Sequence, residues 1–237
     1  MALTLEKVLI RQGDFSLRAD LSISAGARVA VIGPSGSGKS TLLNAIAGFL
    51  PVDQGVIRWR GADLAQLPPG ARPISILFQD QNLFPHLTVA QNVGMGLRPD
   101  LRLSPDQRAA VDAALDRVGL PGMGTRRPAQ LSGGQQSRVA LARVLLRARD
   151  LILLDEPFAA LGPALKDEML ALVASIADET GATLLMVSHD PDDARAICPL
   201  TVVIEEGTAQ PPVPTRPLLD HPPPALAAYL GSPRTNA

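Results

Sequence analysis

The sequence predicts an α/β fold in which a mostly parallel sheet carries an antiparallel β edge and an inserted helical subdomain. Short apolar runs alternate with helical patterns along most of the 237 residues, which is typical of βα units. Two early segments instead alternate apolar and polar residues, as strands at an antiparallel edge do. The stretch 85–130 lacks runs of β-branched residues and is expected to be helical.

Uninterrupted apolar runs are expected to form the parallel strands, because strands covered on both faces need apolar residues at every position. They are Arg28–Ile32, Ser75–Phe78, Leu151–Leu154, Thr183–Ser188 and Thr201–Ile204. The antiparallel edge is expected over Leu3–Ile10, Leu17–Ile23 and Val56–Arg60. A loop over 33–38 leads into a helix over Ser40–Gly48, which Pro51 cannot continue.

The helical subdomain over 85–130 interrupts a core that comprises residues 1–84 and 131–206. Thr88 is expected to cap a helix over 89–97. The run Ser104, Pro105, Asp106 is a strong start for a second helix, which Gly119 ends. Residues 207–237 are rich in proline and predict a poorly ordered tail with one short helix, Pro224–Leu230.

The composition excludes several classes of protein. Lys and Arg number 22 against 23 Asp and Glu, so the net charge is −1 and nucleic acid is not an expected partner. No apolar stretch is long enough to span a membrane, and the first residues lack the pattern of a signal peptide. The single cysteine, Cys198, excludes a disulfide scaffold, suits a reducing compartment and is expected to be a small buried residue.

The segment GPSGSGKST, between an expected strand and an expected helix, matches the phosphate-loop pattern G-x-x-x-x-G-K-[ST]. Its glycines let backbone N–H groups approach phosphate oxygens, and the helix N-terminus adds partial positive charge. Lys39 is expected to reach the terminal phosphates, and the Ser40 hydroxyl to bind Mg²⁺. The predicted nucleotide-binding residues of this loop are Gly33, Pro34, Ser35, Gly36, Ser37, Gly38, Lys39, Ser40 and Thr41.

Two carboxylates, Asp155 and Glu156, follow the apolar run LILL. At the end of a buried strand, Asp155 is placed to hold Mg²⁺, and Glu156 is the natural general base for an attacking water. The pair alone is also typical of acids that cap a strand at the surface. Beside the phosphate loop, it predicts hydrolysis of a nucleoside triphosphate.

The pentapeptide LSGGQ, residues 131–135, precedes a helical pattern. Its last four residues, Ser132, Gly133, Gly134 and Gln135, would form a second anion-binding helix start. One chain has little use for two distant phosphate sites unless two chains share them. In the order found here, the motifs resemble those of the ATP-binding cassette (ABC) ATPases, a class of P-loop NTPases. The resemblance implies a homodimer in which LSGGQ of one subunit closes over the ATP of the other.

The resemblance assigns roles to two further residues. Gln79, after the run SILF, matches the glutamine that senses Mg²⁺ and the attacking water in that family. His189, after TLLMVS, matches the switch histidine that contacts the γ-phosphate, and it joins Glu156 as an expected catalytic residue. ATP and Mg²⁺ are the implied cofactors, with Ser40, Gln79 and Asp155 as metal ligands. His86 and His221 lack such positions, and we expect both to be surface residues.

The segment LFQDQNLFPHLTVAQNVGMGL, Leu77–Leu97, is more particular and is similar to the ATPase subunits of bacterial thiamine importers. This resemblance implies a subunit that energises thiamine uptake, peripheral on the cytoplasmic face of the inner membrane. Its partners would be an integral membrane permease and, indirectly, a periplasmic solute-binding protein. An importer of another small solute and an ATP-binding switch with weakened catalysis are the alternatives. An ABC ATPase that acts on DNA or ribosomes is disfavoured, because the sequence has no basic surplus and no long coiled coil.

Two positions depart from the family pattern. Gly162 stands where the family usually has an aspartate that helps to couple the two sites of the dimer. No aromatic residue occurs around Leu9–Gln12, where the family normally offers one to stack on adenine. Phe15 is nearby but displaced, and the guanidinium plane of Arg11 is an alternative stacking surface.

Overall fold

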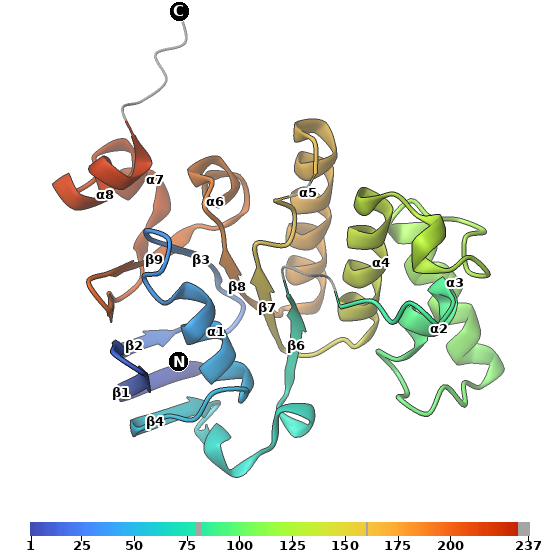
Figure 1. The fold of residues 1–237 in the computed structure, drawn as a ribbon, viewed down its shortest axis with the longest axis horizontal. Helices are drawn as coiled ribbons and strands as arrows, with labels where there is room; N and C mark the ends of the chain where they lie inside the picture. Colours follow the sequence, from blue (N-terminus) through green and yellow to red (C-terminus); the bar gives the residue numbers. More distant parts are fainter. Residues whose placement is uncertain (79–81, 160, 232–237) are drawn as a thin grey trace, which may run out of the picture. The chain divides into compact units, whose positions relative to one another are not determined.

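The computed structural model describes residues 1–78, 82–159 and 161–231 (Figure 1). The chain packs as two compact units, which we call the N/C unit (Met1–Arg72 with Thr183–Ala237) and the middle unit (Pro73–Ala182). The predicted core over 1–84 and 131–206 and the predicted subdomain over 85–130 use other boundaries and stay a prediction. Gln79 lies outside the described residues.

The antiparallel edge of the N/C unit forms where the alternating pattern predicted it. Strand β1 (Leu3–Gln12) pairs antiparallel with β2 (Phe15–Ile23) and with β4 (Gln54–Trp59). The short strand β5 (Ala62–Asp63) pairs with β4. Along β2 every second residue is buried, namely Leu17, Ala19, Leu21 and Ile23. This period of two keeps the strand register, because a slip by one residue would expose the whole apolar set.

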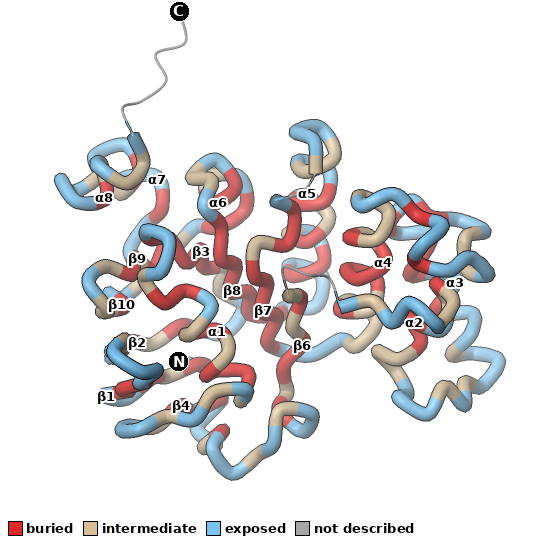
Figure 2. The backbone as a smooth tube through the Cα atoms, viewed as in Figure 1, coloured by how far each residue is buried: buried red, intermediate tan, exposed pale blue. Residues whose placement is uncertain are grey.

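Parallel strands form the other part of the same sheet. Strand β3 (Arg28–Ile32) lies between β8 (Thr183–Val187) and β9 (Leu200–Glu205) and runs parallel to both. All five residues of β8 are buried, as the red colour of this strand shows (Figure 2). Helix α1 (Lys39–Ala47) follows β3, and α6 (Pro191–Ile197) follows β8. The strand–loop–helix order predicted around the phosphate loop is therefore confirmed.

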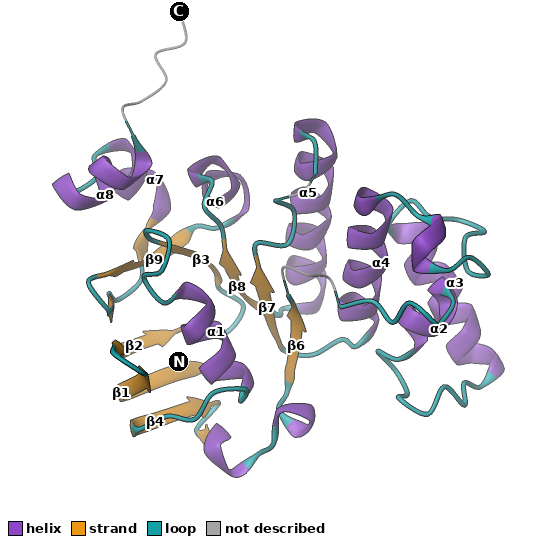
Figure 3. Cartoon of the chain, viewed as in Figure 1, coloured by secondary structure: helices purple, strands orange, loops and turns teal. Residues whose placement is uncertain are grey.

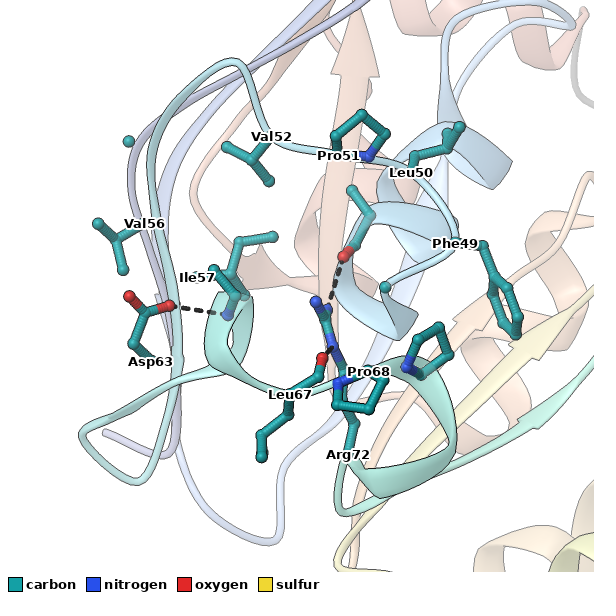
Figure 4. Close-up of a pocket in the computed structure, with 15 residues that line it drawn as sticks. Phe49, Leu50, Pro51, Val52, Val56, Ile57, Asp63, Leu67, Pro68 and Arg72 are labelled. Carbon is teal, nitrogen blue, oxygen red and sulfur yellow. Dashed lines mark hydrogen bonds between the residues drawn. The ribbon is translucent and has the colours of Figure 1, made fainter.

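A buried arginine closes the C-terminal end of α1 (Figure 4). Two 3₁₀ turns, η1 (Leu64–Gln66) and η2 (Pro69–Ala71), precede Arg72, whose Nη1 donates to the carbonyls of Ala45 (3.0 Å) and Ile46 (2.6 Å). A cation at this end is stabilised by the partial negative charge of the helix C-terminus. Burial lowers the pKa of Arg72. Arg72 also lines a pocket of about 510 Å³ that none of the predicted site residues lines.

The C-terminal segment is more regular than the sequence predicted, so the expectation of a poorly ordered tail is wrong for residues 207–231. Strand β10 (Thr208–Ala209) pairs with β9 and β2, and β11 (Val213–Pro214) pairs with β9. Two helices follow, α7 (Thr215–Asp220) and α8 (Pro224–Leu230). Helix α8 is the one that the sequence predicted.

Specific contacts hold this segment in place. The Thr201 and Thr215 hydroxyls share a buried hydrogen bond of 2.8 Å, which ties α7 to β9. Arg195 of α6 donates to Asp220 of α7 at 2.6 Å. The sequence prediction was wrong here because it took the high proline content as a sign of disorder. Prolines also restrict the unfolded chain, so a few contacts are enough to order such a segment.

In the described part of the middle unit, β6 (Ile74–Leu77) pairs in parallel with β7 (Leu151–Asp155). The α-helices of this unit are α2 (Val89–Gly94), α3 (Pro105–Arg117), α4 (Gly133–Leu146) and α5 (Pro163–Thr180) (Figure 3). Both predicted caps are confirmed: the Thr88 and Ser104 hydroxyls accept from the N–H groups three residues on, in complete capping boxes. Helix α2 ends at Gly94, earlier than predicted, and Gly96 beyond it lies so close to the backbone carbonyl of Arg143 in α4 that a Cβ atom would collide with it.

Cys198 directly follows α6 and is only 3% exposed. Burial is the main cause that raises the pKa of its thiol to about 12. The thiol therefore stays protonated, and the prediction of a small buried residue is confirmed. Along the described parts of the chain, no helix combines the length and the apolar character that crossing a membrane requires.

Candidate nucleotide site

The loop after β3 packs directly on neighbouring strands of the N/C unit. A Cβ atom on Gly33 would collide with the backbone carbonyl oxygen of Ile204 in β9. Gly38 has a φ of 105°, and a Cβ there would lie 2.7 Å from the ring of Phe15 in β2. Glycine is thus required at both ends of the loop, for lack of space at Gly33 and for space and backbone conformation at Gly38.

Polar groups of this loop are held at the first turn of α1. Lys39 is 8% exposed, and its Nζ donates to the carbonyls of Gly33 (2.7 Å) and Pro34 (2.9 Å). Ser40, the next residue, is exposed. The buried Ser37 hydroxyl is one of the side-chain groups in the described residues that have no hydrogen-bond partner. A cation, an exposed hydroxyl and a buried unpaired hydroxyl at a helix N-terminus suit an anionic ligand.

His189 lies at the same edge of the sheet as the phosphate loop. Strands β3 and β8 are parallel neighbours, with Val31 opposite Val187, so the segments that follow them leave from the same end. His189 itself is exposed. The preceding Ser188 is buried, and its Oγ donates to a carboxylate oxygen of the buried Asp193 at 2.7 Å. This bond fixes the turn between β8 and α6 on which His189 lies.

The two predicted carboxylates end β7 in the middle unit. Asp155 is the last residue of the strand and is 8% exposed. Glu156 is half-buried and has a φ of 46°, in the left-handed region that favours glycine. The strand therefore ends at Asp155, and the backbone turns at Glu156. Six other non-glycine residues in the described part of the chain share this region, so the conformation alone does not mark a functional site.

The LSGGQ segment forms the N-terminus of α4, as predicted. Ser132 is the N-cap, its Oγ accepts from the Gln135 N–H at 3.3 Å, and the Gln135 side chain accepts from the Ser132 N–H at 3.0 Å. The Ser132 hydroxyl acts only as an acceptor in this capping box, so its proton remains available for an anion. Ser132 and Gly133 are exposed, whereas a Cβ on Gly134 would lie 3.1 Å from the Leu165 side chain.

The two departures from the family pattern have clear structural settings. Gly162 is the N-cap of α5, exposed, with φ −67° and with no heavy atom within 4 Å of an added Cβ. Nothing in the backbone requires glycine there. At the phosphate loop, the aromatic ring in contact is Phe15, whereas Arg11 is exposed and its N–H donates to Asp53 at 2.7 Å.

The structure therefore places the predicted residues in two groups. The N/C unit carries the phosphate loop and His189 at one sheet edge, and the middle unit carries Asp155, Glu156 and the LSGGQ helix. Sequence reasoning missed Arg72, which closes the C-terminal end of α1, and Asp193, which holds the turn that carries His189. Their signal was weak, because a single polar residue in a helical or turn pattern is usually a solvated one.

Comparison with known proteins identifies the class of the chain. The family model described as ABC transporter matches residues 17–159. The chain belongs to this family, and it is an ABC transporter ATPase. The solved structure of the ATP-binding cassette MJ0796, a dimer in a post-hydrolysis state bound to ADP and Pi, matches with a TM-score of 0.80 and 30% identity. That match covers 90% of this chain and 99% of the other. The predicted fold class is thereby confirmed.

Relatives of known name are similar over nearly the whole chain. The thiamine import ATP-binding protein ThiQ of Cereibacter sphaeroides is 63% identical, over 97% of this chain and 99% of that protein. ThiQ of Ruegeria sp. (strain TM1040) is 61% identical, over 97% of this chain and all of that protein. ThiQ of Brucella suis biovar 1 is 47% identical, over 98% and 96%.

Proposed function

We propose that this chain is the ATP-hydrolysing subunit of an importer for thiamine. The observation that carries the proposal is the similarity, across nearly the full length, to thiamine import ATP-binding proteins from several bacteria. The intact phosphate loop, carboxylate pair and LSGGQ helix support hydrolysis rather than binding alone. The subunit would be peripheral on the cytoplasmic face of the inner membrane, with an integral membrane permease as its direct partner and a periplasmic binding protein as an indirect one.

Within each subunit, the residues of the phosphate loop, Gly33–Thr41, would bind ATP. Lys39 would turn from the Gly33 and Pro34 carbonyls to the phosphate oxygens. Glu156 would accept a proton from the attacking water, and His189, which follows β8, would contact the γ-phosphate. Ser132 to Gln135 of the second subunit would complete the site, in keeping with the dimeric cassettes that this chain resembles.

The proposed metal ligands carry oxygen donors of the kind that Mg²⁺ binds. Ser40 offers an exposed hydroxyl in the first turn of α1, and Asp155 offers a carboxylate at the end of β7. Hard oxygen donors in small number suit Mg²⁺, which usually keeps waters and phosphate oxygens as its other ligands. When bound, the ion would neutralise charge that develops on the phosphates. Gln79, the third proposed ligand, lies outside the described residues.

Uptake measurements test the transported solute. In cells that lack this subunit, labelled thiamine uptake should fall to background and should return with the parent chain but not with Glu156→Gln. Uptake of sulfate, a solute of different chemistry, should stay at the parent level. Normal thiamine uptake without the subunit, at thiamine concentrations that limit growth, would reject thiamine as the solute and leave the ATPase assignment standing.

The loop over 82–88, which we call the docking loop, is proposed to contact the permease. Phe84 is 39% exposed and packs edge-on against exposed His86, with ring centroids 6.1 Å apart. Aromatic residues are enriched at protein interfaces relative to the rest of the surface, and this supports the proposed contact. Leu83 and Leu87 are only partly exposed, so they contribute mainly to packing within the unit.

Phe84→Asp is expected to detach the permease and uncouple transport, because it places a charge in an apolar contact. The isolated subunit should fold and hydrolyse ATP as the parent does. Co-purification with the permease measures this. Val213→Asp is the matched control, since Val213 is 38% exposed and lies outside the docking loop. Co-purification of Phe84→Asp at the parent level would contradict the assignment.

Gly162→Asp is expected to raise the Hill coefficient for ATP and to lengthen the lifetime of the ATP-bound dimer. A carboxylate here would accept charge-assisted hydrogen bonds across the subunit interface, and the open space around Gly162 admits it. Aspartate would also cap α5, so Gly162→Asn is the control, because asparagine caps a helix equally well without charge. ATPase rates measured against ATP concentration give the Hill coefficient of each variant. Unchanged or lower cooperativity in the aspartate variant would contradict the proposed coupling role of this position.

A further inference from the structure

A fully buried asparagine holds the docking loop in shape. Asn92 of α2 is 0% exposed. Its Oδ1 accepts from the Phe84 N–H at 2.8 Å, and its Nδ2 donates to the carbonyls of Phe84 (3.1 Å), Thr88 (3.0 Å) and, more weakly, Leu87 (3.4 Å). One side chain thus satisfies both backbone groups of Phe84, the residue with the exposed ring.

This arrangement is specific to an amide side chain. The site requires one acceptor and more than one donor at the same buried position. An apolar residue of the same size would leave the Phe84 N–H without its acceptor, whereas the Phe84 and Thr88 carbonyls would keep the backbone N–H groups of Leu87 and Asn92. Asn92 itself cannot move out to follow the loop, because Val89 and Val93 on the same helix are also 0% exposed. The loop would therefore lose these bonds if it moved into water.

The same loop is anchored to the LSGGQ helix. Arg143 of α4 donates from Nη1 to the Asn82 carbonyl at 2.9 Å, at the start of the docking loop. Beyond α2, Gly96 lies against the backbone carbonyl of the same Arg143. The α2 N-terminus is tied as well, since the Val89 and Ala90 N–H groups donate to the carbonyls of Arg126 and Gly124. The docking loop and α4 are therefore joined on both sides of α2.

We propose that Asn92 is the positioning residue of the docking loop, and that Arg143 joins this loop to the LSGGQ helix, so that the permease acts on Ser132 through them. The inference rests on the proposed contact between the docking loop and a permease. It goes beyond that contact, because it assigns the loop geometry and its link to α4 to two side chains that lie outside both the docking loop and the predicted nucleotide-site residues.

Amide hydrogen exchange on the isolated subunit tests the positioning role without a partner. In Asn92→Leu, exchange at the Phe84 N–H should become about tenfold faster, the change expected when a buried hydrogen bond is lost. Val93→Ala is the matched control: it removes buried contacts from the same helix, and Phe84 exchange should stay at the parent rate. Asn92→Asp keeps the acceptor, so it should protect Phe84 partly and tests the role if the leucine variant does not fold.

ATPase and uptake assays with the permease test whether the docking loop is coupled to the LSGGQ helix through Asn92 and Arg143. Asn92→Leu and Arg143→Met should lower permease-stimulated ATPase and uptake by about tenfold each while basal ATPase of the isolated subunit stays unchanged. Parent-rate exchange at Phe84 in Asn92→Leu, or an equal coupling loss in Val93→Ala, would overturn the inference. Failure of the parent subunit to bind any permease would reject the proposed contact instead, and the exchange result would still decide the role of Asn92.

Discussion

Glutamine in place of Glu156 is expected to abolish turnover of ATP while leaving ATP binding intact. Glu156 is the proposed general base for the attacking water, and loss of a general base typically costs 10²- to 10⁴-fold in rate. Glutamine has nearly the same shape, so the left-handed turn at φ 46° should persist. Because hydrolysis would no longer separate the subunits, ATP should trap a dimer that light scattering detects.

The chain offers a matched control for this experiment. Glu206 is exposed and also has a φ of 46°, but it lies in the turn after β9 and has no role in the proposed site. Glu206→Gln therefore removes a carboxylate from a comparable backbone conformation, and its ATPase rate should equal that of the parent. A Glu156→Gln protein that hydrolyses ATP at the parent rate, or that stays monomeric with ATP, would rule out the proposed role.

Lys39→Ala is expected to weaken the binding of ATP itself, by roughly 10- to 100-fold. The ammonium group neutralises phosphate charge before any reaction occurs, and hydrogen bonds to charged groups contribute about 1.5–3 kcal/mol. Alanine is a good helix former, so the first turn of α1 should remain. Calorimetric titration with ATP measures the loss directly.

Lys7→Ala serves as its control, because Lys7 is an exposed residue of β1 and the same charge is removed. The affinity of that variant should match the parent. Unchanged affinity in Lys39→Ala would mean that the loop over 33–41 does not bind the phosphates, and the nucleotide site would then have to be sought elsewhere.

Features encoded by local spacing were predictable from the sequence. The apolar runs at β3, β7 and β8 predicted buried strands, and Ser104 with Gln107 three residues later gave the start of α3. The phosphate loop was predictable for the same reason, since its glycines, Lys39 and Ser40 act within a few residues of one another. For these elements the physical cause lies in neighbouring residues, so a single sequence contains it.

Features that depend on distant partners were not predictable. Arg72 caps α1 from 26 residues away, and Asn92 acts on a loop eight residues earlier. The order of residues 207–231 depends on Thr201 and Arg195, which precede that segment. The left-handed turn at Glu156 is likewise not encoded by residue type, since glutamate has no preference for that conformation.

The burial of Cys198 makes the protein suited to site-specific labelling. It is the single cysteine of the chain, and its thiol is shielded from solvent with a pKa raised to about 12, so maleimide probes should not react with it in the folded protein. A cysteine introduced at an exposed position such as Ser132 or Gly162 would then carry the only accessible thiol. Spin labels or fluorophores attached there would report the distance between the subunits of the proposed dimer without prior removal of the native cysteine.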